Sequence, residues 1–294
     1  SGAVSTAGDY AATLWLTHNS STGDIVIPVS LTVAPAGAYT AIAAGAWSDS
    51  NVWRDHLSTP PTVSDDVLIT AGAAITVNAP AVCANFAIEY GATLTIPDGF
   101  TLTVEATAIN SGTLTHSRAV AGGAPVALGH LLNSGGTPVY HGVVLASAAE
   151  MGLVTATIRG RQACTTAGAG DTVNRCFNIT PAIVPTDGVT LTFYFAASEI
   201  PTGQACETME VYHHNGTTWS APLARDMAYG VDGRDCSAEP YSIRVVGVAD
   251  FSPFVLKSGS APNAVRTLTA SALSLWDFAP LLALLGAAAL SRAE

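Results

Sequence analysis

The segments Ala92-Thr-Leu-Thr-Ile96, Phe100-Thr-Leu-Thr-Val104 and Gly112-Thr-Leu-Thr115 repeat one short pattern, in which leucine alternates with threonine. Such alternation is typical of a strand that buries one face, because successive side chains of a strand point to opposite sides. Two further strand-like runs precede them, Asp66-Val-Leu-Ile69 and Ala74-Ile-Thr-Val77. These five segments, here called the strand ladder, predict a short β-solenoid over residues 36–118, in which each coil buries its face on the next. A sandwich formed by the same strands is the alternative.

Two tryptophans, Trp47 and Trp53, precede this ladder. They either cap the end of its core or form a platform on which a sugar could stack. Together with Pro61, Asp65-Asp66-Val-Leu-Ile69 and Gly91-Ala-Thr-Leu94, they resemble the start of solenoid modules in many bacterial exported proteins.

Residues 1–35 predict a β-hairpin. Tyr10–Thr17 and Asp24–Val33 are strand-like, and His18–Gly23 between them is typical of a loop. Gly8-Asp-Tyr-Ala-Ala-Thr-Leu-Trp-Leu16 and Ile27-Pro-Val-Ser-Leu-Thr-Val33 resemble the closing hairpin of bacterial surface Ig-like domains. A lone hairpin is marginal in water, so we expect it to pack on another domain or molecule. The alternating apolar residues of the second strand are the candidates for strand addition: Ile25, Ile27, Val29, Leu31 and Val33.

Residues 119–257 predict an Ig-like β-sandwich, with residues 119–135 as a linker-like start. Short alternating strands separated by turns are the signature of a sandwich. The segments Thr190-Leu-Thr-Phe-Tyr-Phe195, Glu210–Trp219 and Val246–Leu256 resemble a C-terminal β-sandwich of bacterial secreted proteins, which implies an accessory or structural module. The predicted strands are Thr137–Leu145, Leu153–Arg159, Cys176–Ile179, Val189–Phe195, Met209–His213, Thr218-Trp219, Tyr241–Val246 and Phe251–Leu256.

The composition fits an all-β chain outside the cytosol. Charged residues make up 11% of the sequence, against about 25% in an average globular protein. The net charge of −11 argues against a nucleic-acid partner, which would require clustered Lys and Arg. A surface with so few charges is poorly protected against association, which favours burial in an assembly. Because the chain opens at Ser1-Gly2 without Met, we expect a processed chain or a fragment.

The five cysteines contain no CxxC motif, so they do not indicate a zinc site. The simplest pairing is Cys164–Cys176 with Cys206–Cys236, although four cysteines allow three connectivities. Disulfides would place the chain in an extracellular or cell-surface location. Cys83, the remaining cysteine, lies in an apolar segment and is expected to be a buried thiol.

No motif in the sequence predicts catalysis. GxSxG, HExxH and P-loop patterns are absent, so we expect no enzyme and no catalytic residue. We also expect no metal site and no cofactor, with calcium kept as an alternative. The residues considered for a metal are Glu207, Glu210, His213 and His214, and those considered for calcium are Asp49, Asp55, Asp65 and Asp66.

The C-terminal region begins with a linker at residue 258 and continues as Leu273-Ser-Leu-Trp-Asp-Phe-Ala-Pro-Leu-Leu-Ala-Leu-Leu-Gly-Ala-Ala-Ala-Leu290. Its apolar residues predict one helix that is buried on all sides. The segment resembles the C-terminal sorting anchors of bacterial exported proteins. Those anchors end in a basic cluster, whereas this chain ends in Ser291-Arg-Ala-Glu294 with Arg292 as the one basic residue of these four, which shifts the expectation from lipid toward a protein assembly. The anchor or assembly residues are Leu275, Trp276, Phe278, Leu281, Leu282, Leu284, Leu285 and Leu290.

These features together predict an extracellular structural protein that polymerises with copies of itself into a filament or layer. Its predicted fold is all-β, a short β-solenoid plus an Ig-like β-sandwich, with a single C-terminal apolar helix. A monomeric surface protein tethered to a membrane by that helix is the first alternative. A carbohydrate-binding adhesin that uses Trp47, Trp53 or Trp219 is the second.

Overall fold

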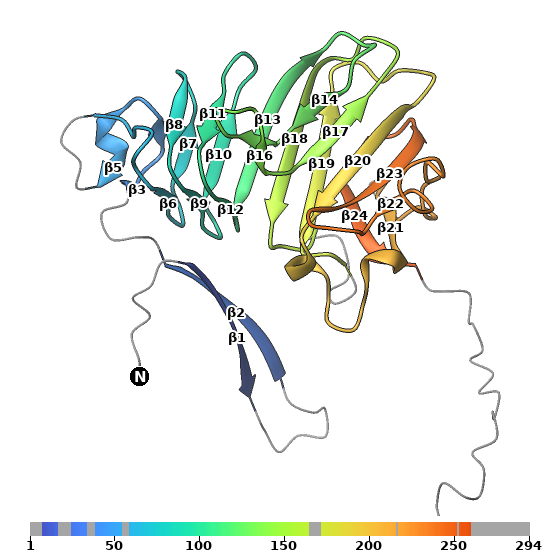
Figure 1. Cartoon of the computed structure of the whole chain (residues 1–294), viewed down its shortest axis with the longest axis horizontal. Coiled ribbons are helices and arrows are strands. Elements are labelled where there is room, and N and C mark those ends of the chain that lie inside the picture. Colours follow the sequence, from blue (N-terminus) through green and yellow to red (C-terminus); the bar gives the residue numbers. More distant parts are fainter. Residues whose placement is uncertain are drawn as a thin grey trace, which may run out of the picture. The chain divides into compact units, whose positions relative to one another are not determined.

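A computed structural model describes residues 8–16, 25–33, 39–54, 59–164, 172–215, 217–251 and 253–259 (Figure 1). These residues form β-strands and contain no α-helix, so the all-β class expected from the composition is confirmed. The only helical turns among them are the 3-10 helices η1 (Ser50–Val52), η2 (Ala197–Glu199) and η3 (Cys206–Thr208).

The first two strands form the hairpin that the sequence predicts. Strand β1 (Gly8–Leu16) pairs antiparallel with β2 (Ile25–Val33). Residues paired across a hairpin share a face, so the register places one row of largely apolar residues together. That row pairs Leu16 with Ile25, Leu14 with Ile27, Ala12 with Val29, Tyr10 with Leu31 and Gly8 with Val33. In the described part of the chain, the two strands form a sheet of their own.

Three ladders of parallel strands follow, and the chain contributes strands to each in turn. The first ladder contains β3 (Tyr39–Ala41), β6 (Val67–Ile69), β9 (Phe86–Ile88) and β12 (Ala108–Asn110), with β5 (Trp53–Arg54) antiparallel to β3. The second contains β4 (Gly45–Ala46), β7 (Ala74–Thr76), β10 (Thr93–Ile96) and β13 (Thr113–Val120). The third contains β8 (Ala81–Cys83), β11 (Leu102–Val104) and β15 (Leu131–Leu132), with β16 (Pro138–Tyr140) antiparallel to β15.

The Thr-Leu-Thr pattern accounts for the packing of these ladders. Leu94 and Leu114 are fully buried inside the second ladder, whereas the flanking threonines remain partly exposed on its outer face. Thr93 pairs with Thr113 and Thr95 with Thr115, so the threonines of successive strands stand side by side. The alternation therefore divides the ladder into an apolar inner face and a hydroxyl-bearing outer face, as the sequence predicts.

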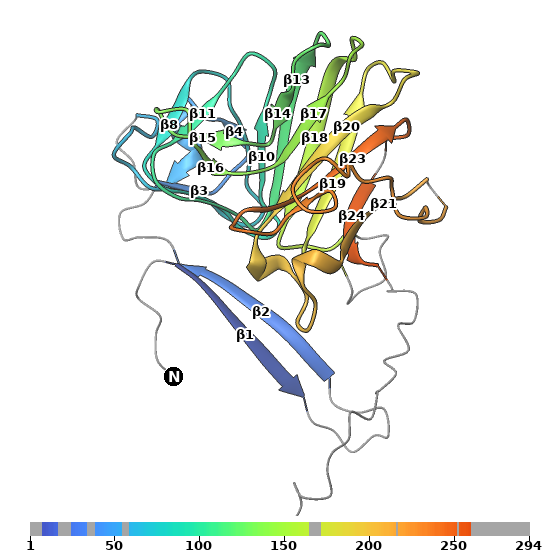
Figure 2. The same cartoon turned by 45° about the vertical axis from the view of Figure 1, so that its right-hand side comes forward.

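The second ladder continues into an eight-stranded sheet that extends beyond the parallel strands (Figure 2). Antiparallel strands join β13 in the order β18 (Gly152–Gly160), β19 (Arg175–Pro181), β24 (Pro253–Ser258) and β21 (Met209–His213). One row of buried side chains crosses six neighbouring strands without a break. It contains Ile75, Leu94, Leu114, Ile158, Phe177 and Phe254, which are at most 1% exposed.

A second, antiparallel sheet shares one hydrophobic core with the far half of this eight-stranded sheet. Its strands are β14 (Val126–Leu128), β17 (Val143–Ala146), β20 (Val189–Phe195), β23 (Tyr241–Val248) and β22 (Arg234–Asp235). Phe193 of β20 lies 5.0 Å from Phe177 and 5.4 Å from Phe254, measured between ring centroids. Two antiparallel sheets therefore enclose the core of this half of the structure.

The linker expected over residues 119–135 is wrong. This segment contains the end of β13 and all of β14 and β15, and its Leu128 and Leu131 are at most 2% exposed. Gly129 between them adopts a φ of +69°, and a Cβ there would lie 2.4 Å from Ile158 Cδ1. Gly129 therefore permits a tight turn inside the core, whereas the exposed Gly123, Gly135 and Gly136, which suggested a linker, lie in turns and bends between strands.

Several predicted features lie outside the described residues. They include the C-terminal apolar helix within Leu273–Leu290, most of the linker before it, and the hairpin loop over residues 18–23. Within the described ranges, no helix has the length and apolar character needed to cross a membrane.

Candidate functional site

A buried ion pair lies where the parallel strands meet the antiparallel sheets. Arg175 is the first residue of β19, and Glu199 is the last residue of η2. Arg175 Nε lies 3.0 Å from Glu199 Oε1, and Arg175 Nη2 lies 2.9 Å from Glu199 Oε2, so the contact is bidentate. Both side chains are at most 7% exposed. Such an arrangement holds the two groups in one fixed geometry.

Backbone groups complete the hydrogen bonding of the pair. Arg175 Nη1 donates to the carbonyl oxygens of His141 at 2.6 Å and Tyr194 at 2.9 Å. Glu199 Oε2 accepts from the backbone N–H of Ala196 at 2.8 Å. Burial by itself would lower the pKa of Arg175, but the neighbouring Tyr140 and Glu199 outweigh it and raise that pKa. The guanidinium therefore remains charged and ties together three separate chain segments.

Tyr140 and Asn110 extend this network toward the parallel strands. The guanidinium of Arg175 lies over the Tyr140 ring, 4.9 Å from its centroid. Asn110 Nδ2 donates to the Tyr140 hydroxyl at 3.2 Å and to the carbonyl of Ile158 at 3.2 Å. Burial raises the pKa of Tyr140, so its hydroxyl keeps its proton. Within the described ranges, that hydroxyl accepts one hydrogen bond and donates none.

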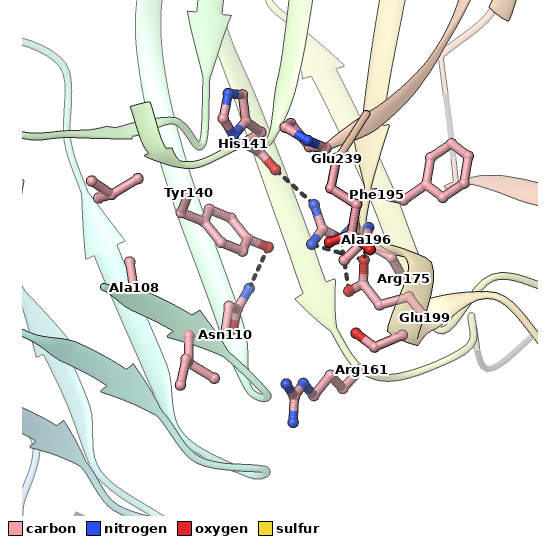
Figure 3. Close-up of a pocket in the computed structure, with 14 residues that line it drawn as sticks. Ala108, Asn110, Tyr140, His141, Arg161, Arg175, Phe195, Ala196, Glu199 and Glu239 are labelled. Carbon is pink, nitrogen blue, oxygen red and sulfur yellow. Dashed lines mark hydrogen bonds and ion pairs between the residues drawn. The ribbon is translucent and has the colours of Figure 1, made fainter. Parts of the chain in front are cut away.

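These residues form the floor of a pocket of about 340 Å³ (Figure 3). Asn110 and Tyr140 come from the parallel-strand side, whereas Arg175 and Glu199 come from the antiparallel side. Arg161, Ser198 and Glu239 are exposed residues that line the same pocket. Concave sites of this kind, with a few placed polar groups, are the usual form of small-molecule binding sites. We call it the junction pocket, because it lies where the parallel and antiparallel strands meet, and it is the candidate functional site.

Three aromatic rings pack together close to the pocket. The centroids of His130, His141 and Tyr194 lie 5.3 to 5.4 Å apart. Burial lowers the pKa of His130 to about 4, with a smaller contribution from His141. Burial also lowers the pKa of His141. These imidazoles are therefore neutral near pH 7.

His116 is a buried histidine in the inner row of β13, between Ile96 and Ala156. Its Nδ1 accepts from the backbone N–H of Gly129 at 3.0 Å. Its Nε2 is buried and has no hydrogen-bond partner among the described residues. Burial, together with Arg118, lowers the pKa of His116 to about 4.

We expect acid to destabilise the fold through His116. Its pKa is about 4 when folded and 6.5 when unfolded, so the unfolded chain binds more protons between these pH values. Stability is therefore retained above pH 6.5 and lost as the pH falls toward 4, by about 3 kcal/mol for this residue. In urea unfolding at pH 7, 5.5 and 4.5, His116→Asn should lose less stability than the wild type. Parallel pH dependences of the two proteins would contradict this role for His116.

The disulfides follow the simplest predicted pairing. Cys164 is bonded to Cys176, and Cys206 is bonded to Cys236. Cys83 is a buried free thiol, as expected, and burial raises its pKa strongly.

Three of the four residues considered for metals are used in other contacts. Glu210 forms ion pairs with Arg225 and Arg234, at 3.1 and 2.6 Å. His213 packs on Phe254 and His214 on Trp219. Glu207 lies beside another pocket, together with Asp232 and Asp235. Within the described ranges, no group of three His, Cys, Asp or Glu side chains could hold a metal ion.

The aspartates considered for calcium likewise serve local structure. Asp49 caps η1 by accepting from the N–H of Asn51, and Asp65 accepts from the N–H of Thr62. Asp66 accepts from Asn85 Nδ2 at 2.6 Å. Asp55 lies outside the described residues.

The tryptophans at the start of the ladder cap its core. Trp47 and Trp53 are 2% and 4% exposed, and their rings pack edge to face at 5.2 Å. Trp53 Nε1 also donates to the carbonyl of Trp47. A sugar platform on these two rings is wrong, because neither ring face is open. Trp219 is half-buried against His214.

Sequence reasoning missed the junction pocket. Its floor residues Asn110, Tyr140, Arg175 and Glu199 are far apart in the chain, and none belongs to a recognisable motif. The one usable signal was Arg175 itself, a charged residue at the start of the apolar strand Arg175-Cys-Phe-Asn-Ile179, in a chain with few charges.

Comparison with known proteins gives no match to a family model, to a curated protein or to a solved structure.

Proposed function

We propose that this protein is an extracellular structural protein, a subunit of a cell-surface filament or layer. In this proposal the three parallel ladders are a short β-solenoid, and the two antiparallel sheets form an Ig-like β-sandwich. The observation that carries the proposal is the unbroken row from Ile75 to Phe254, which runs through both halves. A shared sheet resists bending between modules better than a flexible linker would, and stiffness suits a structural subunit.

Two further observations support this function. Disulfides persist in oxidising compartments, and this chain has two. The hairpin register gathers apolar residues on one face, and an isolated two-stranded hairpin is marginal in water. We therefore propose that the hairpin pairs or packs with another copy, and that residues 273–290 provide a second apolar contact. The proposal includes no catalytic step.

Assembly should depend on the apolar face of the hairpin. We expect the disulfide-bonded full chain to form filaments or sheets in negative-stain microscopy. Val29→Lys places a charge in the apolar row and should abolish these polymers. Deletion of residues 273–294 should also abolish them, because it removes the second apolar contact.

Ser30→Lys is the matched control, since it puts the same side chain on the opposite face of the same strand, opposite Ala11. This variant should still polymerise. If the wild-type protein forms only single particles at every concentration tested, the assembly function is refuted. If it needs detergent to remain as single particles, the membrane-tethered alternative is favoured. Polymers that survive both Val29→Lys and the deletion would also refute it.

A further inference from the structure

The junction pocket has balanced charges. Arg161 and Arg175 contribute two positive charges, and Glu199 and Glu239 contribute two negative charges. His141, which also lines the pocket, is neutral near pH 7 because burial lowers its pKa. A charged ligand of either sign would therefore meet as many repelling charges as attracting ones. A neutral ligand with many polar groups avoids this conflict.

The pocket also offers donors and acceptors close together. The Tyr140 hydroxyl accepts from Asn110 and, among the described residues, has no acceptor for its own hydrogen. Glu239 Oε1 accepts from the backbone N–H of Ala197 at 3.0 Å, and a carboxylate can accept several further bonds. Ser198 adds a hydroxyl that can do either. A ligand whose own groups both donate and accept would satisfy this mixture.

Apolar groups form the remaining walls. Ile109, Val139 and Pro240 line the pocket beside the polar groups, and each is partly exposed. The volume of about 340 Å³ lies at the small end of the range for small-molecule sites. The floor is fixed before any ligand arrives, because Arg175 and Glu199 hold one another and three backbone groups. Such preorganisation lowers the entropic cost of binding.

We propose that the junction pocket binds a neutral sugar ring, with Tyr140 donating to one ring hydroxyl and Glu239 accepting from another. The C–H groups of a pyranose ring suit the apolar walls, and its hydroxyls suit the mixed polar groups. This binding function is independent of polymerisation, so either proposal can fail without the other.

Saturation-transfer NMR and calorimetry on the disulfide-bonded full chain would test this site. The probes are glucose, galactose, mannose and N-acetylglucosamine, with glucuronate and glucosamine as charged counterparts. We expect saturable binding of at least one neutral sugar, and weaker binding of both charged sugars. Tyr140→Phe and Glu239→Gln should each weaken binding about tenfold, the effect of losing one good hydrogen bond.

Tyr90→Phe is the matched control for Tyr140→Phe, because Tyr90 is 67% exposed and does not line the pocket. Its affinity should equal that of the wild type. Glu239 lies on the exposed rim, and Glu239→Gln keeps an oxygen that can accept from the Ala197 N–H. This variant therefore tests the site even if Tyr140→Phe disturbs folding. The proposal is overturned if no neutral sugar binds, if a charged sugar binds more tightly, or if both pocket variants bind like the wild type.

Discussion

Removing both disulfide bonds is expected to lower the free energy of unfolding by about 6.5 kcal/mol. The bonds join cysteines separated by 12 and 30 residues. In the chain-entropy account, loops of these lengths contribute about 3 and 3.5 kcal/mol. Urea unfolding of Cys164→Ser/Cys176→Ser, of Cys206→Ser/Cys236→Ser and of the combined variant would measure each contribution.

The two bonds should act at different places. Cys164–Cys176 closes the connection between β18 and β19, within one sheet. Cys206–Cys236 joins η3, which leads into β21, to the loop after β22, and these are edge strands of different sheets. Loss of the second bond should therefore expose the sheet edge near Cys206 first, which hydrogen exchange would detect.

Cys83→Ala is the control for this experiment, since Cys83 is a buried free thiol. Its unfolding should respond to a reductant in the same way as that of the wild type. Equal stability of the oxidised and reduced wild-type protein would contradict the prediction. It would also remove the main support for an extracellular location, because the bonds would then have no stabilising role.

The sequence predicts strands best where an alternating pattern is long and one face is buried. Val189–Phe195 is predicted with the bounds that β20 has, and all three Thr-Leu-Thr segments contain strands. In these segments the pattern of apolar side chains is itself the cause of burial. Local sequence and tertiary structure therefore give the same answer.

The shortest strands could not be predicted in the same way. Strands β8, β9 and β12 have three residues each, too few for alternation to be distinguished from chance. Their positions are fixed by neighbours one coil away, such as Phe86, which pairs with both Val67 and Ala108. The linker error has the same origin, because Leu128 and Leu131 are buried by distant residues and not by their own glycine-rich surroundings.

The junction pocket was beyond the reach of the sequence for a related reason. Its contacts join residues far apart in the chain: Asn110 and Tyr140 are 30 residues apart, and Arg175 is 34 residues from His141, whose carbonyl it contacts. Such contacts depend on the fusion of parallel and antiparallel strands at β13. That fusion follows from the packing of whole sheets, and no local pattern encodes it.

Removing one member of the buried ion pair should have the second largest effect on stability. Arg175→Met would leave the Glu199 carboxylate buried at 4% exposure without its cation, together with the carbonyls of His141 and Tyr194. Breaking a buried pair in this way costs about 3–5 kcal/mol. Glu199→Gln should be costly for the mirror reason, since it leaves the guanidinium of Arg175 without a counter-charge. Urea unfolding at pH 7 would measure both variants.

The double variant Arg175→Met/Glu199→Gln separates loss of the pair from loss of packing. Each single variant leaves one uncompensated charge in the core, whereas the double variant leaves none. Its destabilisation should therefore be smaller than the sum for the two single variants. Asp226→Asn is the matched control for Glu199→Gln. It removes one charge from the ion pair between Arg244 and Asp226, which lie 3.7 Å apart and are 36% and 27% exposed, and it keeps the Oδ1 that accepts from the backbone N–H of Ala228. Exposed pairs contribute about 0–1 kcal/mol, so this variant should remain close to the wild type. Additive effects at Arg175 and Glu199 would show instead that the two side chains stabilise the junction separately, through their contacts with the backbone.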